Sequence, residues 1–429
     1  MKNQLPKWYR LRRYLHFDEP LSLKSATKLV TNPACVASHP FWPLIRFDVN
    51  TKKISQDKLT KGIVTKQKIR PISYAAHSDS LIYSYYCEYL SGLYEDQIKN
   101  KKLNDVVLAF RSLGKNNIDF AKQAFDEIKN RQSSSVIALD ITKFFDTLSH
   151  QILKSSWKKI LNLENLPKDH LAVFNSVTKF SYVDREEIFE LLNISNSNPR
   201  SDGRRRICSP LEFRIQVRLG NYIKPNPLKD TKQGIPQGTS LSALLSNIYM
   251  LEFDLAASEF VGEHNGKYMR YCDDMLFIMP LHKGKLAEDF ATDKIKELKI
   301  EINPSKTDRC DFMIKNGFLS TKKSLQYLGF LFDGQRTTIR SAAFAKYSNR
   351  VKRGVSLAKQ TMRRKNNIKA LLGCPETNLY KKQLFSRYSH LGKRNFIRYA
   401  HNAAEILNSK SIKKQIRPLW KRLLEEINS

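Results

Sequence analysis

The alternation of apolar and polar residues predicts short strands that carry carboxylates at their ends. Residues 136–139 form an apolar run that ends at Asp140, which is the pattern of a short buried strand. Farther along, two strand-like runs, 268–272 and 275–279, flank an Asp-Asp pair at 273–274. The simplest interpretation is an antiparallel hairpin whose turn is a solvated Asp-Asp pair.

A second pattern predicts a helix that follows a glycine-rich loop. Between residues 241 and 251, leucine and isoleucine recur at i, i+3, i+4, i+7 and i+10, which is one apolar stripe. Thr239 or Ser240 is the expected N-cap. The loop is not a phosphate-binding P-loop, because the Gly-Lys-Ser/Thr end is missing. An ordinary core helix would explain the stripe but not the Gln237-Gly238 pair beside the cap.

The remaining segments mix strand, helix and loop. Residues 64–73 predict a short basic strand that Pro71 ends, and the apolar, Tyr-rich residues 80–93 predict a helix. The polar, Arg-rich segment from about 183 to 232 is interpreted as an inserted loop or small subdomain. Two strand-and-turn patterns, 298–312 and 325–334, come before a basic helical tail.

Composition indicates a globular protein of two or three packed subdomains. The chain has 429 residues, of which 41% are apolar. No run approaches the roughly 18 apolar residues of a membrane span, and the basic N-terminus lacks a signal-peptide core, so we expect a cytoplasmic protein that does not bind membranes. The six cysteines form no C-x-x-C pair, which argues against a zinc knuckle and against a disulfide framework.

The charge of the chain indicates a polyanionic partner. Its formal net charge is +33. Residues 340–429 hold 22 basic and 4 acidic residues, so +18 of that charge lies in the last part of the chain. Aromatic residues are interleaved with the basic ones there, which favours nucleic acid over a merely solubilising surface.

Three carboxylates in a basic protein suggest metal-dependent phosphoryl transfer. Asp140, Asp273 and Asp274 would repel one another and raise one another's pKa unless cations neutralised them. Hard oxygen ligands are those that Mg²⁺ takes. Transfer onto a growing nucleic acid uses two metal ions about 3.5 to 4 Å apart, and three carboxylates on adjacent strands could hold such a pair.

Taken together, the motifs resemble those of the reverse transcriptases, especially the bacterial branch related to group II intron and retron enzymes. Motif A corresponds to ALDITKFFDTLSH, motif B to QGIPQGTSLSALLSNIYM and motif C to RYCDD. Motif D corresponds to LKIEINPSKT and the primer-grip motif E to LQYLGF, while KIRPIS and VLAFRSLGKNN resemble the fingers motifs. The resemblance covers about residues 60–335 in the family's order.

The resemblance assigns roles to individual residues. Asp140, Asp273 and Asp274 would hold two Mg²⁺ ions, with Mn²⁺ as an alternative, and the backbone carbonyl of Ile141 would help. Lys306 would be the acid for pyrophosphate.

The resemblance also implies nucleotide and nucleic-acid contacts. The residues expected to contact the incoming dNTP are Arg111, Lys68, Arg70, Phe145, Gln237 and Gly238. Phe145 would be the gate that excludes a 2′-hydroxyl. The residues expected to contact primer and template are Tyr327, Leu328, Gly329, Arg363, Arg364 and Lys365. For each basic residue, a solvated surface charge is the alternative.

The chain departs from two branches of the family. NPACVASHP has the ingredients of a retron Asn-Ala-x-x-His element at another spacing, and the tail has no Val-Thr-Gly. No residues remain for the maturase and endonuclease domains of group II intron proteins. With Cys in the second position of motif C and the tail LFSRYSHLGKRNFIRYA…IRPLWKRL, the chain looks more like the defence-associated (DRT) reverse transcriptases, with the standalone second class as the best match. That resemblance implies antiphage defence and a structured non-coding RNA as template for the cDNA.

The expected fold is therefore α+β, a right-hand polymerase with an antiparallel palm sheet and a helical basic thumb. The expected domains are an N-terminal extension with fingers (1–135), a palm (136–335) with an insertion at about 183–232, and the thumb (336–429). The expected function is RNA-directed DNA polymerase. An untemplated or protein-primed DNA polymerase and a non-catalytic RNA-binding scaffold are the alternatives. The oligomeric state is left open.

Overall fold

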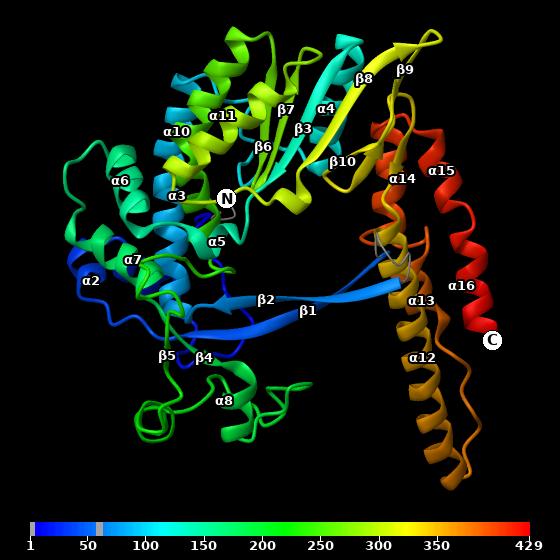
Figure 1. Ribbon diagram of the computed structural model, residues 1–429. Helices are drawn as coiled ribbons and strands as arrows, with labels where there is room; N and C mark the ends of the chain where they lie inside the picture. Colours follow the sequence, from blue (N-terminus) through cyan, green and yellow to red (C-terminus); the bar gives the residue numbers. More distant parts are fainter. Residues whose placement is uncertain (1–4, 57–62) are drawn as a thin grey trace.

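The computed structural model describes residues 5–56 and 63–429, and the side chains of residues 5–51 and 67–429. At its centre lies a five-stranded antiparallel sheet in the order β6-β7-β3-β8-β9 (Figure 1). The strands of this central sheet are β3 (Ser134–Asp140), β6 (Lys267–Tyr271), β7 (Asp274–Met279), β8 (Asp308–Lys315) and β9 (Phe318–Thr321). The strand expected before Asp140 and the antiparallel hairpin are confirmed, but the turn is formed by Cys272 and Asp273, and Asp274 is a partly buried residue of β7 rather than part of a solvated turn.

Both faces of the central sheet are buried, and the side chains of each strand alternate between them. On β3, Ile137 and Leu139 belong to one apolar cluster, whereas Val136 belongs to another. On β7, Phe277 joins the first cluster and Leu276 the second. Because successive side chains of a strand point to opposite faces, this alternation fixes which way each strand end is directed.

One face of the central sheet is covered by long helices around α10 (Ser240–Glu263). Its neighbours in this layer are α3 (His77–Asn100), α6 (His150–Leu161) and α11 (Gly284–Glu297). Thr239 caps α10 through its side-chain oxygen, as expected. The prediction of a single apolar stripe was incomplete, because an almost unbroken run of residues from Leu241 to Leu251 is buried. Helices on several sides and the sheet enclose the first half of α10, so this half is core around its whole circumference, whereas residues such as Glu252 and Glu259 in the second half are exposed.

The other face of the central sheet is covered by α4 (Asn117–Arg131), which also packs against the C-terminal helices. α4 shares one apolar cluster with β3, with the small sheet β10-β11-β12, and with the C-terminal helices. The strands of the small sheet are β10 (Leu325–Tyr327), β11 (Phe330–Phe332) and β12 (Thr337–Ile339). The C-terminal helices are α12 (Ser341–Leu371), α13 (Lys381–Tyr388), α14 (Phe396–Ile406), α15 (Lys410–Ile416) and α16 (Leu419–Asn428).

A four-stranded sheet in the order β2-β1-β4-β5 lies apart from the central sheet (Figure 1). Its strands are β1 (Leu44–Gln56), β2 (Ile63–Tyr74), β4 (Ser181–Asp184) and β5 (Lys224–Pro225). β1 and β2 pair as one long antiparallel hairpin, and β4 joins β1 in parallel. The short basic strand is thus part of this longer hairpin, and the prediction that Pro71 ends it is wrong, because β2 continues through Pro71, opposite Asp48, to Tyr74.

The segment 183–232 packs around an apolar cluster of its own. It contains α8 (Arg185–Leu191), α9 (Pro210–Glu212) and the π-helix η1 (Phe213–Arg218). Its cluster includes Phe213 together with Phe17 from the N-terminal segment. The rings of Phe17 and Phe213 lie 4.7 Å apart between centroids. A core shared with residues so distant in sequence makes this segment a packed unit rather than a loose loop.

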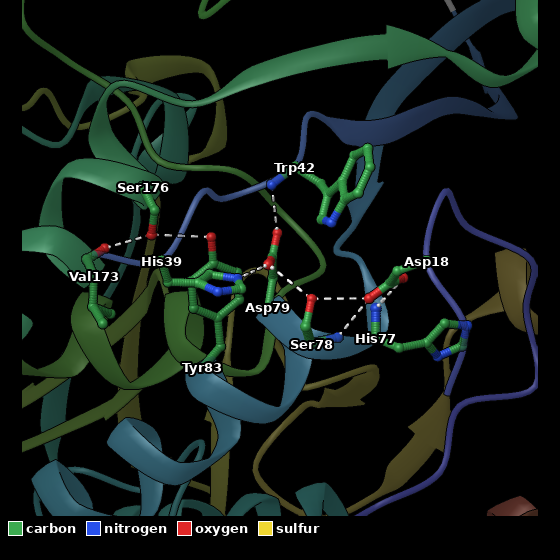
Figure 2. A network of polar contacts seen from close by, with 9 residues as sticks. All are labelled: Asp18, His39, Trp42, His77, Ser78, Asp79, Tyr83, Val173 and Ser176. Carbon is green, nitrogen blue, oxygen red and sulfur yellow. Dashed lines mark hydrogen bonds and ion pairs between the residues drawn. The ribbon is translucent and has the colours of Figure 1, made fainter. Parts of the chain in front are cut away.

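Polar contacts hold the N-terminal segment and the chain before β1 onto the start of α3 (Figure 2). Asp18 accepts hydrogen bonds from the backbone N–H groups of His77 and Ser78, each at 2.8 Å. Asp79, fully buried, contacts the His39 ring at 2.7 Å and accepts the Trp42 N–H at 2.9 Å. α3 has no side-chain cap at its own N-terminus, so Asp18 supplies that cap from a distant segment.

The other helices complete the layers. They are α1 (Leu23–Val30), α2 (Pro33–Ala37), α5 (Phe144–Thr147), α7 (Lys168–Thr178) and the 3₁₀ turn η2 (Pro304–Lys306). Within the described residues, no helix is both long enough and apolar enough to cross a membrane. The α+β class and the antiparallel palm sheet are confirmed.

Candidate active site

Two of the three aspartates face each other across neighbouring strands. Asp140 is the last residue of β3 and Asp274 is the first residue of β7, and the two are direct cross-strand partners. Directly opposite residues of an antiparallel pair have Cβ atoms about 4.5–5.5 Å apart and point to the same face. Asp273 lies in the turn beside them, after Cys272, whose backbone has a positive φ of 60°. Sheet register therefore brings Asp140 and Asp274 together, and the turn places Asp273 next to Asp274 in the chain.

The pKa of Asp274 is affected by the two neighbouring carboxylates. Burial, then the neighbouring Asp273 and Asp140, raise the pKa of Asp274 to about 7, although Lys306 and Arg340 act to lower it. The two neighbouring carboxylates therefore add to the effect of burial, which disfavours the ionised form of Asp274.

Lys306 is the cation closest to this cluster. It stands at the end of η2 and its ammonium forms an ion pair with the Asp140 carboxylate. Backbone bonding fixes the approach, because the Asn303 N–H donates to the Asp140 carbonyl at 2.7 Å. The predicted pyrophosphate acid thus lies beside a predicted metal ligand.

The donor set fits a hard divalent cation. Carboxylate oxygens are the ligands that such ions take, and a cation would relieve the repulsion that raises the pKa of Asp274. Across residues 5–56 and 63–429, no group of three His, Cys, Asp or Glu side chains is already gathered at metal-binding distances. Asp140 is instead paired with Lys306, so this pairing would have to loosen when a cation binds. Ile141 is buried and bridges to Ile302, and the role of its carbonyl stays a prediction.

Of the fingers residues, Lys68 faces the cluster. Burial, then Arg70 and Lys306, lower the pKa of Lys68, while Asp140 and Asp273 act to raise it. Lys68 and Arg70 are both exposed on β2, and the Arg70 guanidinium lies 3.4 Å from the Thr51 hydroxyl. The long hairpin thus carries basic side chains to the same side as the carboxylates.

The prediction that Arg111 contacts a triphosphate is not supported by its position. Its side chain is only 1% exposed and pairs with Glu95 at 2.6 Å. The same guanidinium donates to the backbone carbonyls of Asn104 and Val107. With these groups occupied, Arg111 fixes the segment after α3 rather than presenting a free cation.

The two adjacent phenylalanines after β3 differ in burial. Phe144 is 3% exposed and belongs to the apolar cluster that contains Ile137 and Leu139. Phe145 is half-buried at the edge of that apolar cluster. Their ring centroids are 5.6 Å apart. Phe145 is therefore the member of the pair with a ring surface available beside Asp140.

The loop 233–239 ties the helix layer to both the fingers hairpin and the segment after β3. The Gln237 carbonyl accepts the Ser73 N–H at 2.7 Å, and the Ile235 N–H donates to the Phe145 carbonyl at 2.9 Å. Gly238 has φ +115°, and a Cβ there would lie 2.4 Å from the Ser73 carbonyl oxygen. Glycine is thus required at this crossing for conformation and for space.

The predicted primer-grip residues divide between core and turn. Tyr327 is 3% exposed and its ring is buried, so a contact of this residue with primer or template stays a prediction that its backbone would have to provide. The direction of the Tyr327 side chain follows from strand parity, since Leu325 and Tyr327 of β10 both point into the apolar cluster shared with α4. Leu328 and Gly329 form the following turn with φ +46° and +94°, and only this turn is accessible.

The predicted thumb residues Arg363, Arg364 and Lys365 are exposed on α12. They lie far along this helix from its start next to β12. A basic surface on the thumb is therefore present, although what it binds stays a prediction.

The sequence interpretation missed Arg270, a fully buried arginine on β6. It forms a two-point ion pair with Asp254 of α10, at 2.8 and 2.5 Å, and donates to Asn247 at 3.1 Å. It also donates to the Cys272 carbonyl at 3.0 Å, in the turn that carries Asp273. A charged residue at an apolar-parity position of the strand KYMRY was the signal that could have indicated it.

Comparison with known proteins identifies the central segment. Residues 214–332 match the family described as "Reverse transcriptase (RNA-dependent DNA polymerase)". The chain thus contains a reverse transcriptase domain, although the matched segment begins after β3 and does not include Asp140. No curated protein matches the chain.

Several solved structures of yeast telomerases are similar to this chain, each at 12% identity. Apo telomerase of Candida tropicalis truncated from its C-terminal domain gives a TM-score of 0.40, over 75% of this chain and 61% of the other. Apo telomerase of the same organism gives 0.41, over 90% and 60%. Telomerase of Candida albicans in complex with a fragment of telomeric RNA gives 0.39, over 95% and 67%. The chain spans about three fifths of the length of the first two.

Proposed function

We propose that the protein is an RNA-directed DNA polymerase whose catalytic carboxylates are Asp140, Asp273 and Asp274. The observation that carries the proposal is the cross-strand pairing of Asp140 with Asp274, beside Asp273 and Lys306, in a chain with a reverse transcriptase domain. Such a cluster is costly to keep without a cationic ligand, which favours a catalytic role over a structural one.

The three aspartates would hold two divalent cations, Mg²⁺ or Mn²⁺. Such ions supply Lewis-acid activation of the attacking hydroxyl and neutralise the charge that develops on the leaving pyrophosphate. Lys68, on the exposed fingers strand, would bind the triphosphate of the dNTP. Lys306 would give a proton to the leaving pyrophosphate after it separates from Asp140.

The remaining residues would shape the nucleotide site. Phe145 would exclude a ribose 2′-hydroxyl by its bulk, and Gln237 with Gly238 would line the nascent base pair. The accessible turn at Leu328 and Gly329 would hold the primer strand through backbone groups. The exposed cations of α12 would hold the template–primer duplex through its phosphates.

The biological setting is proposed from the sequence resemblance. The C-terminal segment resembles that of defence-associated bacterial reverse transcriptases, which favours a cytoplasmic enzyme that copies a dedicated structured non-coding RNA in antiphage defence. Sequencing the RNA and cDNA that copurify with the protein tests this. A random sample of cellular RNA, with no enriched species, would contradict a dedicated template.

Primer extension tests the polymerase proposal. Wild-type protein should extend a DNA primer on an RNA template with dNTPs and Mg²⁺, and Asp273→Ala with Asp274→Ala should abolish extension while RNA binding persists. Equal extension by the variant would refute the catalytic assignment. DNA made without a primer and covalently attached to the protein would instead indicate a protein-primed enzyme. An intact wild type that incorporates no dNTP on any template would favour a binding scaffold.

A further inference from the structure

A basic cavity of about 870 Å³ lies in the C-terminal helical region. It is formed by the first turns of α12, the end of α13 and the loop before α14. Five exposed cations line it: Lys346, Arg350, Arg387, Lys393 and Arg394. No carboxylate lines it, and within the part of the chain that the structure describes none of the five cations forms an ion pair.

The loop that presents two of these cations is held in one conformation. The Asn395 side-chain amide donates to the carbonyls of Ser386 and Ser389, at 3.1 and 2.7 Å. Gly392 fits only as glycine, because a Cβ there would lie 1.8 Å from the Ser386 carbonyl oxygen. Lys393 and Arg394 follow directly on this turn, so they are held opposite α12 rather than free to move apart.

Crowding of like charges around one recess favours a negative ligand. Two unit charges near a protein surface interact appreciably over several ångströms, and five cations without a counter-ion repel one another. Surface cations without a role normally separate into solvent, whereas here a fixed turn brings them around one recess. The site is therefore suited to a polyanion.

The cavity also has aromatic and apolar walls. Tyr347 donates from its hydroxyl to the Tyr388 carbonyl at 2.5 Å, which fixes both residues at the cavity wall. Tyr388 and Phe396 are half-buried there, and Leu391 lies at the cavity with 62% of its surface exposed. Cations beside aromatic faces are the combination that binds phosphates together with unstacked bases.

We propose that this cavity binds an unpaired, single-stranded segment of nucleic acid, distinct from the duplex held elsewhere on the thumb. The inference rests on the proposed function, since it adds a second contact for the same RNA. A recess of this volume is in the range of small-ligand pockets, so it has room for unstacked bases between its cationic and aromatic walls. The exposed Arg353 follows Arg350 by one turn on the same face of α12, so a strand can leave the recess past a further cation, which a free nucleotide does not need.

The test compares two matched double variants in a catalytically inactive background, Asp273→Ala with Asp274→Ala. One adds Lys393→Ala and Arg394→Ala in the cavity, and the control adds Arg363→Ala and Arg364→Ala farther along α12. Each removes two exposed cations, so neither should alter folding. Binding is measured with a labelled oligouridylate and with a blunt RNA–DNA duplex over a series of salt concentrations.

The cavity variant should lose about tenfold in oligouridylate affinity, and its log–log salt slope should fall by about 1.4, the value for two contacts to a single strand. Its duplex affinity should change less than about twofold, and the control should show the opposite selectivity. Unchanged oligouridylate affinity and slope in the cavity variant would overturn the proposal. The proposal would also be overturned if free dTTP displaced oligouridylate from the parent and control proteins but not from the cavity variant. The site would then be one for a free nucleotide.

Photocrosslinking gives a second measurement without a cavity substitution. Oligouridylate that contains 4-thiouridine should crosslink to residues 386–396, and crosslinks confined to other segments would overturn the assignment. Binding is measured here on inactive protein, so its failure is distinct from a failure of primer extension.

Discussion

Asp140 and Asp274 are direct partners across β3 and β7, and both lie on the face of the central sheet that α4 covers. The parity of Val136 on β3 and Leu276 on β7 sets this direction, because every second side chain shares a face. The position of the carboxylates therefore depends on the register of two strands that are far apart in sequence. Register, rather than any loop, determines the geometry of the candidate active site.

The charge of Asp274 should make metal-free protein less stable at high pH. Burial, Asp273 and Asp140 raise its folded pKa to about 7. A carboxyl whose folded pKa exceeds its unfolded pKa contributes stability below the unfolded pKa, and this contribution is lost as pH rises through the folded pKa. Asp274→Asn cannot ionise, so it does not lose unfolding free energy as pH rises. In the presence of a metal chelator the variant should be more stable than wild type at a pH of about 8 and no more stable than wild type at a pH of about 4. Urea unfolding at both pH values measures this, and equal stabilities at the higher pH would contradict it.

Phe145 should determine the choice between dNTP and rNTP. Phe145→Val removes bulk from a half-buried ring, so it should keep dNTP incorporation and gain rNTP incorporation. Single-nucleotide extension assays measure the ratio. Phe144→Ala is the control, because truncating this core ring should cost about 3–5 kcal/mol of unfolding free energy and lower the yield of folded protein. A well-folded Phe145→Val with unchanged preference would remove the gate assignment.

Gly238→Ala should reduce activity strongly. Its Cβ would lie 2.4 Å from the Ser73 carbonyl oxygen and its φ of +115° is unfavourable for alanine, so the loop must move away from the fingers hairpin. Gly92→Ala is a matched control within α3, where no atom lies within 4 Å of the new Cβ. The control should gain about 0.5–1 kcal/mol of stability and keep activity. Primer extension by the Gly238 variant at the rate of the control would show that the close approach is not needed.

Arg270→Met should destabilise the protein by about 3–5 kcal/mol, because it leaves Asp254 buried and unpaired. Adding Asp254→Leu should recover much of this loss, since an apolar pair can replace a buried ion pair. The double variant still lacks the hydrogen bond to the Cys272 carbonyl, so its kcat should remain low although it is folded. Chemical unfolding and steady-state kinetics separate the two effects. Full activity in the stable double variant would limit Arg270 to a structural role.

Charge reversal at Arg363, Arg364 and Lys365 should flatten the salt dependence of duplex binding. Each phosphate contact contributes about 0.9 to the log–log slope for a duplex, so loss of three contacts should lower it by about 2.7. Fluorescence anisotropy with an RNA–DNA duplex measures the slope. An unchanged slope would place the duplex on another surface.

Local patterns predicted the elements that carry the carboxylates but not the tertiary partners. The strand before Asp140 and the hairpin around Asp273 follow from apolar alternation over a few residues. The pairing of Arg111 with Glu95 is a tertiary contact between separate segments, which no local pattern encodes. Tyr327 was assigned from its motif, whereas its direction depends on which face of β10 meets the core. The enclosure of α10 likewise depends on neighbours from distant parts of the chain.

The cap that Asp18 provides to α3 has a consequence for the order of synthesis. Asp18 leaves the ribosome first, and the N–H groups that it accepts are 59 and 60 residues behind it. The Asp18 carboxylate therefore lacks these two backbone partners until the fingers hairpin and the first turn of α3, up to Ser78, have been synthesised.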